Sequence, residues 1–176
     1  MRIFSKVDSF GDEKLTLKRT PPRDAFWFRL SKLADHSAIW FVLGIIQFAI
    51  FRNIRDFIIF IAAIAIESGL TNGPIKFMFK RKRPHEIENT FNKEEKLPYG
   101  MRRPITSSFP SGHATAGMCA AILLGFKQPL FLIGLIPLAL LVGYSRMYTR
   151  MHHLSDVFCG FILGGIYAFI VIVSLY

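Results

Sequence analysis

The stretch 157–176, VFCGFILGGIYAFIVIVSLY, is an apolar run of 20 residues without a charged side chain. A helix needs about 20 apolar residues to cross the hydrocarbon core of a bilayer. Because lipid offers the backbone no hydrogen-bond partners, a segment that crosses it must satisfy its own amide groups, as a helix does. The run therefore predicts a membrane-spanning helix.

Four further apolar blocks precede this run, at 37–51, 57–66, 114–126 and 129–144. Hydrophobic residues make up 52% of the chain and the mean hydropathy is +0.37, which argues against a soluble core. The blocks are too long for strands but shorter than a full span, so each must extend into its flanks or tilt. We predict an all-α, polytopic membrane helix bundle of about five to six helices. The expected spans are roughly 36–51, 54–79, 112–127, 129–147 and 154–176.

Residues 1–35 are predicted to form a polar or interfacial N-terminal segment, followed by a single membrane domain at 36–176. The first 24 residues contain no apolar core of a secretory signal. Stretch 25–36 mixes aromatic and charged residues at helical spacing. It fits either a helix lying in the membrane interface or the polar start of a longer first span. The two cysteines, Cys119 and Cys159, fall inside apolar blocks and are expected to pack there.

The chain carries 22 Lys and Arg against 12 Asp and Glu. Five spans would place the N-terminal segment, the 80–110 loop and the 145–154 connection on one face. All the basic residues except Arg52, Arg55 and Lys127 belong to that face, so the positive-inside rule predicts that it is cytoplasmic. The excess charge is expected to contact anionic lipid headgroups, and no nucleic-acid partner is expected.

Two polar clusters on this face stand at the ends of predicted spans. In KFMFKRKRP, Lys76 stands at the end of the second span and Arg83-Pro84 comes seven residues later. Alone, this could be a juxtamembrane basic run. In PSGH, residues 110–113, a proline, a capping serine and a glycine precede an apolar block and predict a helix start. The free N–H groups and the positive dipole end of such a start attract an anion.

A third cluster, SRMYTRMHHLSD, occupies residues 145–156. His152 and Asp156 are four residues apart, on one face of a helix expected to begin near residue 152. A carboxylate in that position can accept the proton of one imidazole nitrogen and leave the other nitrogen free as a nucleophile. His153 is three residues from Asp156 and could also reach it, so spacing alone does not choose between the two histidines.

Together the three clusters predict a cage for a phosphate group. Arginine and lysine supply positive charge, arginine in the forked geometry that suits phosphate oxygens. His152 could attack phosphorus, and His113 could protonate the departing oxygen. The residues expected to hold the phosphate are Lys76, Arg83, Ser111, Gly112 and Arg146.

The order of these motifs resembles the signature of the type 2 phosphatidic acid phosphatase family, which is related to vanadium-dependent haloperoxidases. The match runs from about residue 54 to the end. The resemblance implies a metal-independent and cofactor-free phosphatase that works through a phosphohistidine. It assigns His152 as the nucleophile, in preference to His153, with Asp156 as its orienting partner and His113 as the general acid. Family members commonly have six membrane helices, and residues 1–35 stand where the first one would lie.

The implied function is that of an integral membrane lipid phosphatase, and a bacterial inner membrane is the expected location. By analogy with short family members, a polyprenyl diphosphate such as undecaprenyl diphosphate is the favoured substrate. Phosphatidylglycerophosphate, phosphatidic acid, a polyprenyl-phosphoryl sugar phosphate and a lipid A phosphate remain alternatives. Two other classes stay open: a transporter of phosphorylated lipids or anions, and a metal-dependent hydrolase. The second would use His85, His152, His153 and Asp156, although the sequence lacks a His-Glu-x-x-His motif.

The sequence does not assign a single role to three further features. Glu67 lies inside an otherwise apolar run and is expected to pair with a basic or hydrogen-bonding group between helices. Residues 71–74, Thr-Asn-Gly-Pro, should kink or break the second span just before Lys76. The loop 85–103 could shape the mouth of the site and bind a second phosphate or a sugar, or could be a solvated charged segment.

Overall fold

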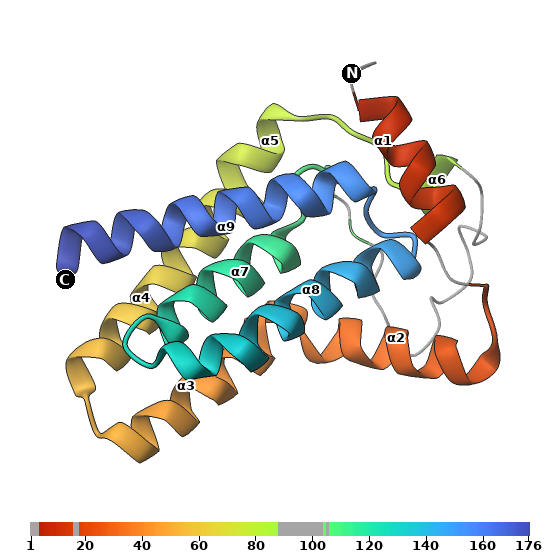
Figure 1. Cartoon of the computed structure of the whole chain (residues 1–176). Helices are drawn as coiled ribbons and strands as arrows, with labels where there is room; N and C mark the ends of the chain where they lie inside the picture. The colour runs from red at the N-terminus through yellow and green to blue at the C-terminus, as the bar shows by residue number, and fades with distance from the viewer. Residues whose placement is uncertain (1–3, 16–17, 88–103, 105) are drawn as a thin grey trace.

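The computed structural model describes residues 4–15, 18–87, 104 and 106–176, and all regular structure in these ranges is helical (Figure 1). The helices are α1 (Ser5–Phe10), α2 (Pro21–Leu33), α3 (Ala38–Phe51), α4 (Ile54–Leu70), α5 (Lys76–Met78), α6 (Pro84–Ile87), α7 (Gly112–Gly125), α8 (Leu132–Tyr148) and α9 (Leu154–Leu175). Short turns of π-helix occur at Gly11–Leu15 and Thr71–Ile75, and of 3-10 helix at Asp35–Ser37 and Pro129–Phe131. The prediction of an all-α bundle is confirmed.

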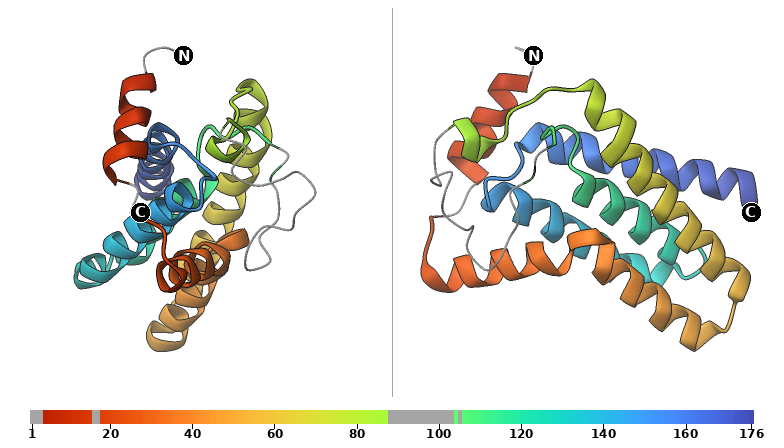
Figure 2. Two further views of the ribbon diagram at one scale, coloured as in Figure 1. Left: turned by 90° about the vertical axis from the view of Figure 1, so that its right-hand side faces the viewer. Right: turned by 180° about the vertical axis from the view of Figure 1, so that it is seen from behind.

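Helix α7 lies in the middle of the bundle, in contact with α9, α8, α4 and α3 (Figure 2). Glycines allow α9 to approach it closely. A Cβ atom on Gly164 would lie 2.2 Å from the carbonyl oxygen of Thr115, and one on Gly160 would lie 2.8 Å from that of Ser111. Close contact through small residues is the usual way in which helices pack in lipid. This contact brings the N-termini of α7 and α9 side by side.

Two helical segments, Pro129–Tyr148 and Leu154–Leu175, are long and apolar enough to cross a membrane. Pro21–Leu33 and Asp35–Phe51 meet the same criteria only as a pair, and they are bent by 59° relative to each other. Helix α7 is apolar but has only 14 residues, and α4 has 17. The described part of the chain therefore contains two candidate spans, or three if the bent pair counts as one. The expected number of five stays a prediction.

The break expected near residues 71–74 is confirmed. After α4 the chain makes one π-helical turn, in which Gly73 leaves helical geometry with φ −92° and ψ −108° and Pro74 has no N–H to donate. A proline inside a helix removes one hydrogen bond and clashes with the preceding turn, which a wider π-turn can absorb. The turn ends at Lys76, the first residue of α5, whose side chain is buried.

The N-terminal segment is folded onto one end of the bundle, where α1 contacts α9 and α2 runs along α8 (Figures 1 and 2). The hydroxyl of Tyr148 on α8 donates to Asp24 on α2 at 2.6 Å. A bend follows α2, with positive φ angles of 53° at His36 and 61° at Ser37. Stretch 25–36 thus holds most of a separate helix and the bend after it, and does not extend the first span in a straight line. The division into segments 1–35 and 36–176 stays a prediction.

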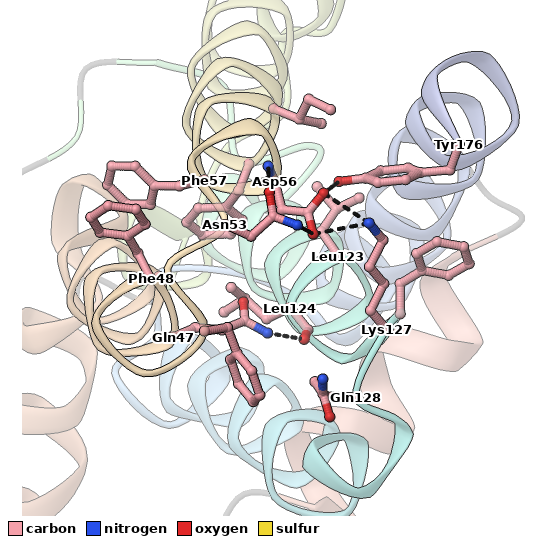
Figure 3. A pocket seen from close by; sticks show the side chains of 15 residues that line it. Gln47, Phe48, Asn53, Asp56, Phe57, Leu123, Leu124, Lys127, Gln128 and Tyr176 are labelled. Carbon is pink, nitrogen blue, oxygen red and sulfur yellow. Dashed lines mark hydrogen bonds and ion pairs between the residues drawn. The ribbon is translucent and has the colours of Figure 1, made fainter.

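The opposite end of the bundle is closed by polar contacts. Lys127 Nζ lies 3.0 Å from each carboxylate oxygen of Asp56, and the hydroxyl of Tyr176 donates to the same carboxylate at 2.9 Å (Figure 3). Beside them is a cavity of about 260 Å³ between α3, α4 and α7, whose lining includes five phenylalanines. Gln47 reaches across the cavity wall and donates to the carbonyl of Leu124 at 2.7 Å. None of the predicted site residues lies at this end.

Candidate active site

The three sequence clusters meet at the end of the bundle where α7 and α9 begin and α8 finishes (Figure 1). The side chain of His113 is 19% exposed. The other predicted site residues are buried: Lys76, Arg83, Ser111, Gly112, Arg146, His152 and Asp156. Burying several cations together is unfavourable unless a negative charge neutralises them. The cluster is therefore arranged for an anion.

The connection between α8 and α9 positions His152. Arg150 has a positive φ of 58°, and the N–H groups of Met151 and His152 both donate to the carbonyl of Arg146, at 3.0 and 3.1 Å. A left-handed residue with such backward hydrogen bonds is a common way to end a helix. It turns the chain so that the His152 side chain is only 2% exposed.

The hydrogen bonds of His152 define which ring nitrogen carries the proton. Arg83 Nη1 lies 3.2 Å from His152 Nε2, and His152 Nδ1 lies 2.6 Å from the carbonyl oxygen of Ser108. A guanidinium can only donate and a carbonyl can only accept. Nδ1 therefore carries the proton and Nε2 presents its lone pair, which is the arrangement that a nucleophilic histidine needs.

The structure shows no hydrogen bond between Asp156 and His152, and the orienting role expected for Asp156 stays a prediction. Asp156 Oδ2 lies 3.7 Å from Nδ1, and the carbonyl of Ser108 takes its place as acceptor. The reason is that α9 begins at Leu154, after an N-cap at His153, so His152 is not on the same helical face as Asp156. The Asp156 carboxylate instead accepts the N–H of His153 at 2.9 Å.

The surroundings of His152 favour its neutral form. Burial holds its pKa well below the usual range, and the positive charges of Arg83, Arg146 and Lys76 act in the same direction. A neutral imidazole keeps its lone pair available at the pH at which cells live.

Arg83 is held in place by four acceptors besides its contact with His152. Nη1 donates to the carbonyl of Met151 at 2.8 Å, and Nη2 donates to the carbonyls of Thr106 and Ser107 at 3.2 Å each. Its backbone N–H donates to Glu86 at 2.6 Å. Burial lowers the pKa of Arg83 to about 10, so the guanidinium remains charged at neutral pH.

Three buried donors of the cluster lack a partner in the part of the chain that the structure describes. They are the hydroxyl of Ser111, Nε of Arg83 and Nε of Arg146. Nη1 of Arg146 donates a hydrogen bond to the hydroxyl of Ser31 on α2. Buried polar groups are normally hydrogen-bonded, so unpaired donors on adjacent cationic side chains mark the place of a missing acceptor. Phosphate oxygens suit that role.

Gly112 gives room for the contact that holds Lys76. Lys76 Nζ donates to Asn72 Oδ1 at 2.9 Å, and a Cβ atom on Gly112 would lie 2.6 Å from the same oxygen. Asn72 is fixed in turn by donating to the backbone carbonyl of Ser68 at 3.0 Å. A larger residue at 112 would displace Asn72, so glycine is required here for packing as well as for access of an anion to the helix N-terminus.

His113 has a carboxylate partner that the sequence did not reveal. Its Nε2 lies 3.0 Å from Asp35 Oδ1, at the bend between α2 and α3. Asp35 is 78 residues away in the chain and stands in no recognisable motif. The contact leaves Nδ1 of His113 as the nitrogen that can exchange a proton with a bound substrate.

Arg81 forms a second unexpected set of contacts beneath the cluster. Its Nη1 donates to Asp156 and, at 2.7 Å, to the hydroxyl of Ser155, while Nη2 donates to Asp8 on α1. Asp8 also accepts the N–H of Ser155 at 3.0 Å, which caps the start of α9. Alternation of lysine and arginine in KRKR, residues 80–83, is the one sequence signal that could have indicated an inward-facing Arg81.

The residues proposed for the metal-hydrolase alternative do not converge. His153 Nε2 donates to the carbonyl of Lys82 at 3.3 Å, and His85 lies against the carbonyl of Arg150 at 3.0 Å. No group of three or more His, Cys, Asp or Glu side chains in the described ranges could hold a metal ion. His152, in contrast, is in contact with Arg83. The geometry supports His152 over His153 as the nucleophile.

Glu67 and the loop 85–103 remain without an assigned role. Glu67 is 1% exposed on α4, and its carboxylate has no hydrogen-bond partner within the described residues, so the expected pairing is not seen. Most of the loop 85–103 lies outside the described part of the chain. The same holds for its four basic residues that could bind a second phosphate or a sugar, Lys93, Lys96, Arg102 and Arg103. The two cysteines are unpaired; Cys119 is fully buried and Cys159 partly so.

The fold is that of an all-α membrane protein, and the residues expected to hold a phosphate gather at one end of its bundle. The chain belongs to the PAP2 superfamily, whose family model matches residues 56–176. This confirms the family that the three motifs indicated.

Two relatives have named functions. The chain is 34% identical over 98 residues to an undecaprenyl-diphosphatase of Sulfolobus acidocaldarius, covering 54% of this chain and 44% of that protein. It therefore spans less than half the length of this relative. It is 30% identical over 138 residues to the decaprenylphosphoryl-5-phosphoribose phosphatase of Mycobacterium tuberculosis, covering 77% of this chain and 71% of that protein.

Two solved structures share the fold. A transmembrane PAP2 type phosphatidylglycerolphosphate phosphatase from Bacillus subtilis aligns with a TM-score of 0.72 and 23% identity, over 97% of this chain and 85% of that one. LpxE from Aquifex aeolicus aligns with a TM-score of 0.70 and 25% identity, over 95% of this chain and 93% of that one. The likeness to the first supports the fold alone.

Proposed function

We propose that the protein is a metal-independent lipid phosphatase that works through a phosphohistidine on His152. The observation that carries this proposal is the set of unpaired buried donors on Ser111, Arg83 and Arg146 around a neutral histidine whose unprotonated Nε2 accepts from Arg83. Three cations and a helix N-terminus hold the phosphoryl oxygens, and positioning and charge stabilisation do most of the work in phosphoryl transfer.

In the first step Arg83 transfers its hydrogen bond from His152 Nε2 to a phosphoryl oxygen, and the freed lone pair attacks phosphorus. The bond from phosphorus to the leaving oxygen breaks as the new P–N bond forms. His113 gives its Nδ1 proton to that oxygen, while Asp35 holds Nε2–H. The carbonyl of Ser108 stabilises the positive charge that develops on the His152 ring.

In the second step the same groups act in reverse order. His113, now neutral at Nδ1, takes a proton from a water molecule, and the resulting hydroxide attacks phosphorus. The P–N bond breaks, the electron pair returns to His152 Nε2, and inorganic phosphate leaves. One water is consumed and the histidines regain their starting protonation states.

A polyprenyl diphosphate is the substrate we propose, because one curated relative is an undecaprenyl-diphosphatase and the other also acts on a polyprenyl lipid. Phosphatidylglycerophosphate, phosphatidic acid, a polyprenyl-phosphoryl sugar phosphate and lipid A phosphate are the alternatives for the same chemistry. A transporter of phosphorylated lipids would need no nucleophile. Transport would therefore not explain why His152 carries its proton on Nδ1 and leaves Nε2 unprotonated.

We also propose that the protein lies in a bacterial inner membrane, with its active site on the cytoplasmic face. The basic N-terminal segment lies at the site end, and the positive-inside rule supports this orientation. Membrane-impermeant labelling of single cysteines placed at Lys18 and at Lys127 in intact cells would test it. Labelling at 127 without labelling at 18 is expected.

The activity itself is tested by phosphate release from detergent-purified protein in EDTA, with a polyprenyl diphosphate, phosphatidylglycerophosphate and phosphatidic acid. Release that survives EDTA and is lost in His152→Ala is expected. Release that requires added metal, or that persists in His152→Ala, would contradict the proposal.

A further inference from the structure

A wide groove opens beside the cage. It has a volume of about 810 Å³, and its lining includes Lys76 of the cage and Asn72, the acceptor that holds Lys76, so the groove adjoins the cage. The groove runs between the end of α4 and the segment around Thr106 and Ser107. A single phosphate in the cage would leave this space empty.

Cations line the groove because of the conformation of residues 79–83. Phe79 is extended, with φ −113° and ψ 130°, and side chains alternate in an extended chain. Arg81 and Arg83 point inward, to Asp156 and to His152 respectively. Arg81 also borders the groove, but Lys80 and Lys82 are the exposed lysines of this segment that line it.

Among the described residues that line the groove, acidic side chains are scarce. Neither Lys80 nor Lys82 forms an ion pair with a residue in the described ranges. One carboxylate, Glu86, lines the groove, but its Oε2 accepts the backbone N–H of Arg83 at 2.6 Å. The hydroxyl-bearing residues Thr106 and Ser107 complete the polar side.

The other side of the groove is apolar. Pro74, Phe77 and Phe79 line it; Phe77 is 86% exposed, and Phe79 packs edge-on against Phe109 with ring centroids 4.7 Å apart. A groove with a cationic side and an apolar side, open at its apolar edge, fits an anionic lipid whose chain leaves toward the bilayer.

We propose that Lys80 and Lys82 form a subsite for a second phosphate group, placed between the scissile phosphate and the lipid tail. The inference rests on the proposed function and defines its substrate class: a lipid with two phosphate groups, of which the outer one is transferred to His152. The compact charge and flexible stem of lysine suit a phosphate that must bind and then leave. In a diphosphate, the bond from the outer phosphorus to the bridging oxygen breaks, and the lipid monophosphate departs along this groove.

Farnesyl diphosphate and farnesyl monophosphate test the subsite, since they share one chain and differ by one phosphate. In EDTA and a neutral detergent, the double variant Lys80→Ala/Lys82→Ala should lose about tenfold in kcat/KM with the diphosphate, as expected for charge-assisted hydrogen bonds. It should lose less than about twofold with the monophosphate. The matched control Lys6→Ala/Lys18→Ala removes two exposed lysines outside the groove and should change neither substrate.

Equal losses on both substrates, or the same loss in the control variant, would show general electrostatics and overturn the subsite. So would a groove variant that keeps its full activity with the diphosphate. Farnesyl diphosphate binding to His152→Ala protein, with and without the two lysine substitutions, separates the subsite from the chemistry. If the native protein releases no phosphate from either lipid, the proposed function fails. If the two lysine substitutions also leave the affinity for farnesyl diphosphate unchanged, the subsite is excluded as well.

Discussion

His113 on α7 forms a hydrogen bond through Nε2 to Asp35, which lies at the bend between α2 and α3. The contact joins the helix that begins at the cage to the N-terminal part of the chain, and it fixes which nitrogen of His113 faces the substrate. Asp35 touches no reacting atom in the proposed mechanism, so its role is to position and charge-stabilise the general acid.

Replacing Asp35 by Asn should lower kcat by about tenfold to hundredfold with a lipid substrate and change KM little, because general acids contribute about 10²- to 10⁴-fold. With p-nitrophenyl phosphate, whose leaving group needs no proton, the loss should be slight. Asp35→Glu should restore part of the lipid activity. Asp24→Asn, which alters a carboxylate of α2 that pairs with Arg19, is the matched control. Equal losses on both substrates would reduce Asp35 to a structural residue.

The protonation of His152 can be observed directly. Because its pKa lies below the ordinary 6.5, the ring should stay neutral at pH 6.5 and gain a second proton only at lower pH. The acid side of the kcat/KM profile should accordingly begin to fall below pH 6.5, since the lone pair persists to lower pH. Nitrogen-15 spectra of histidine-labelled protein, with the His152 signal identified by its loss in His152→Ala, should show a proton on Nδ1. A ring that titrates at or above pH 6.5 contradicts this.

Gly112→Ala should reduce kcat/KM by about tenfold or more without unfolding the protein. The new Cβ would lie 2.6 Å from Asn72 Oδ1 and would push away the acceptor that holds Lys76, and a misplaced charge-assisted hydrogen bond costs about 1.5–3 kcal/mol. Gly134→Ala is the control, because nothing lies within 4 Å of its added Cβ. Unchanged activity in Gly112→Ala would show that Asn72 does not position Lys76.

Gly164→Ala should destabilise the contact between α7 and α9. Its Cβ would lie 2.2 Å from the backbone oxygen of Thr115, and overpacking of this kind costs about 1–3 kcal/mol. The neighbouring Gly165→Ala, whose nearest contact would be 3.9 Å away, should leave the thermal midpoint in detergent unchanged. Equal midpoints for the two variants would mean that the helices are less closely packed than described.

The sequence predicted the local backbone features that position the expected site residues. Helix starts at Gly112 and Leu154 follow from a proline or polar stretch before an apolar block, and the turn before Lys76 follows from Gly73 and Pro74. These features depend on neighbours within a few residues, which is what a single sequence displays.

The omissions concern distant contacts and one register. Asp8, Ser31 and Asp35 reach Arg81, Arg146 and His113 from 73 to 115 residues away, and no spacing rule connects them. The hydrogen bond expected between Asp156 and His152 required His152 to be helical as well. Placing the N-cap at His153 separated the two side chains, and a backbone carbonyl, which no sequence pattern displays, became the partner of Nδ1.

The most direct test of the account is to look for phosphate bound covalently to His152 during turnover. After rapid quenching of the protein with a polyprenyl diphosphate in EDTA, mass spectrometry should find an acid-labile, base-stable phosphoramidate on the peptide that contains His152. The His152→Ala variant should show none and should release no phosphate. Steady phosphate release without any phosphoenzyme, or continued release by His152→Ala, would contradict the phosphohistidine mechanism.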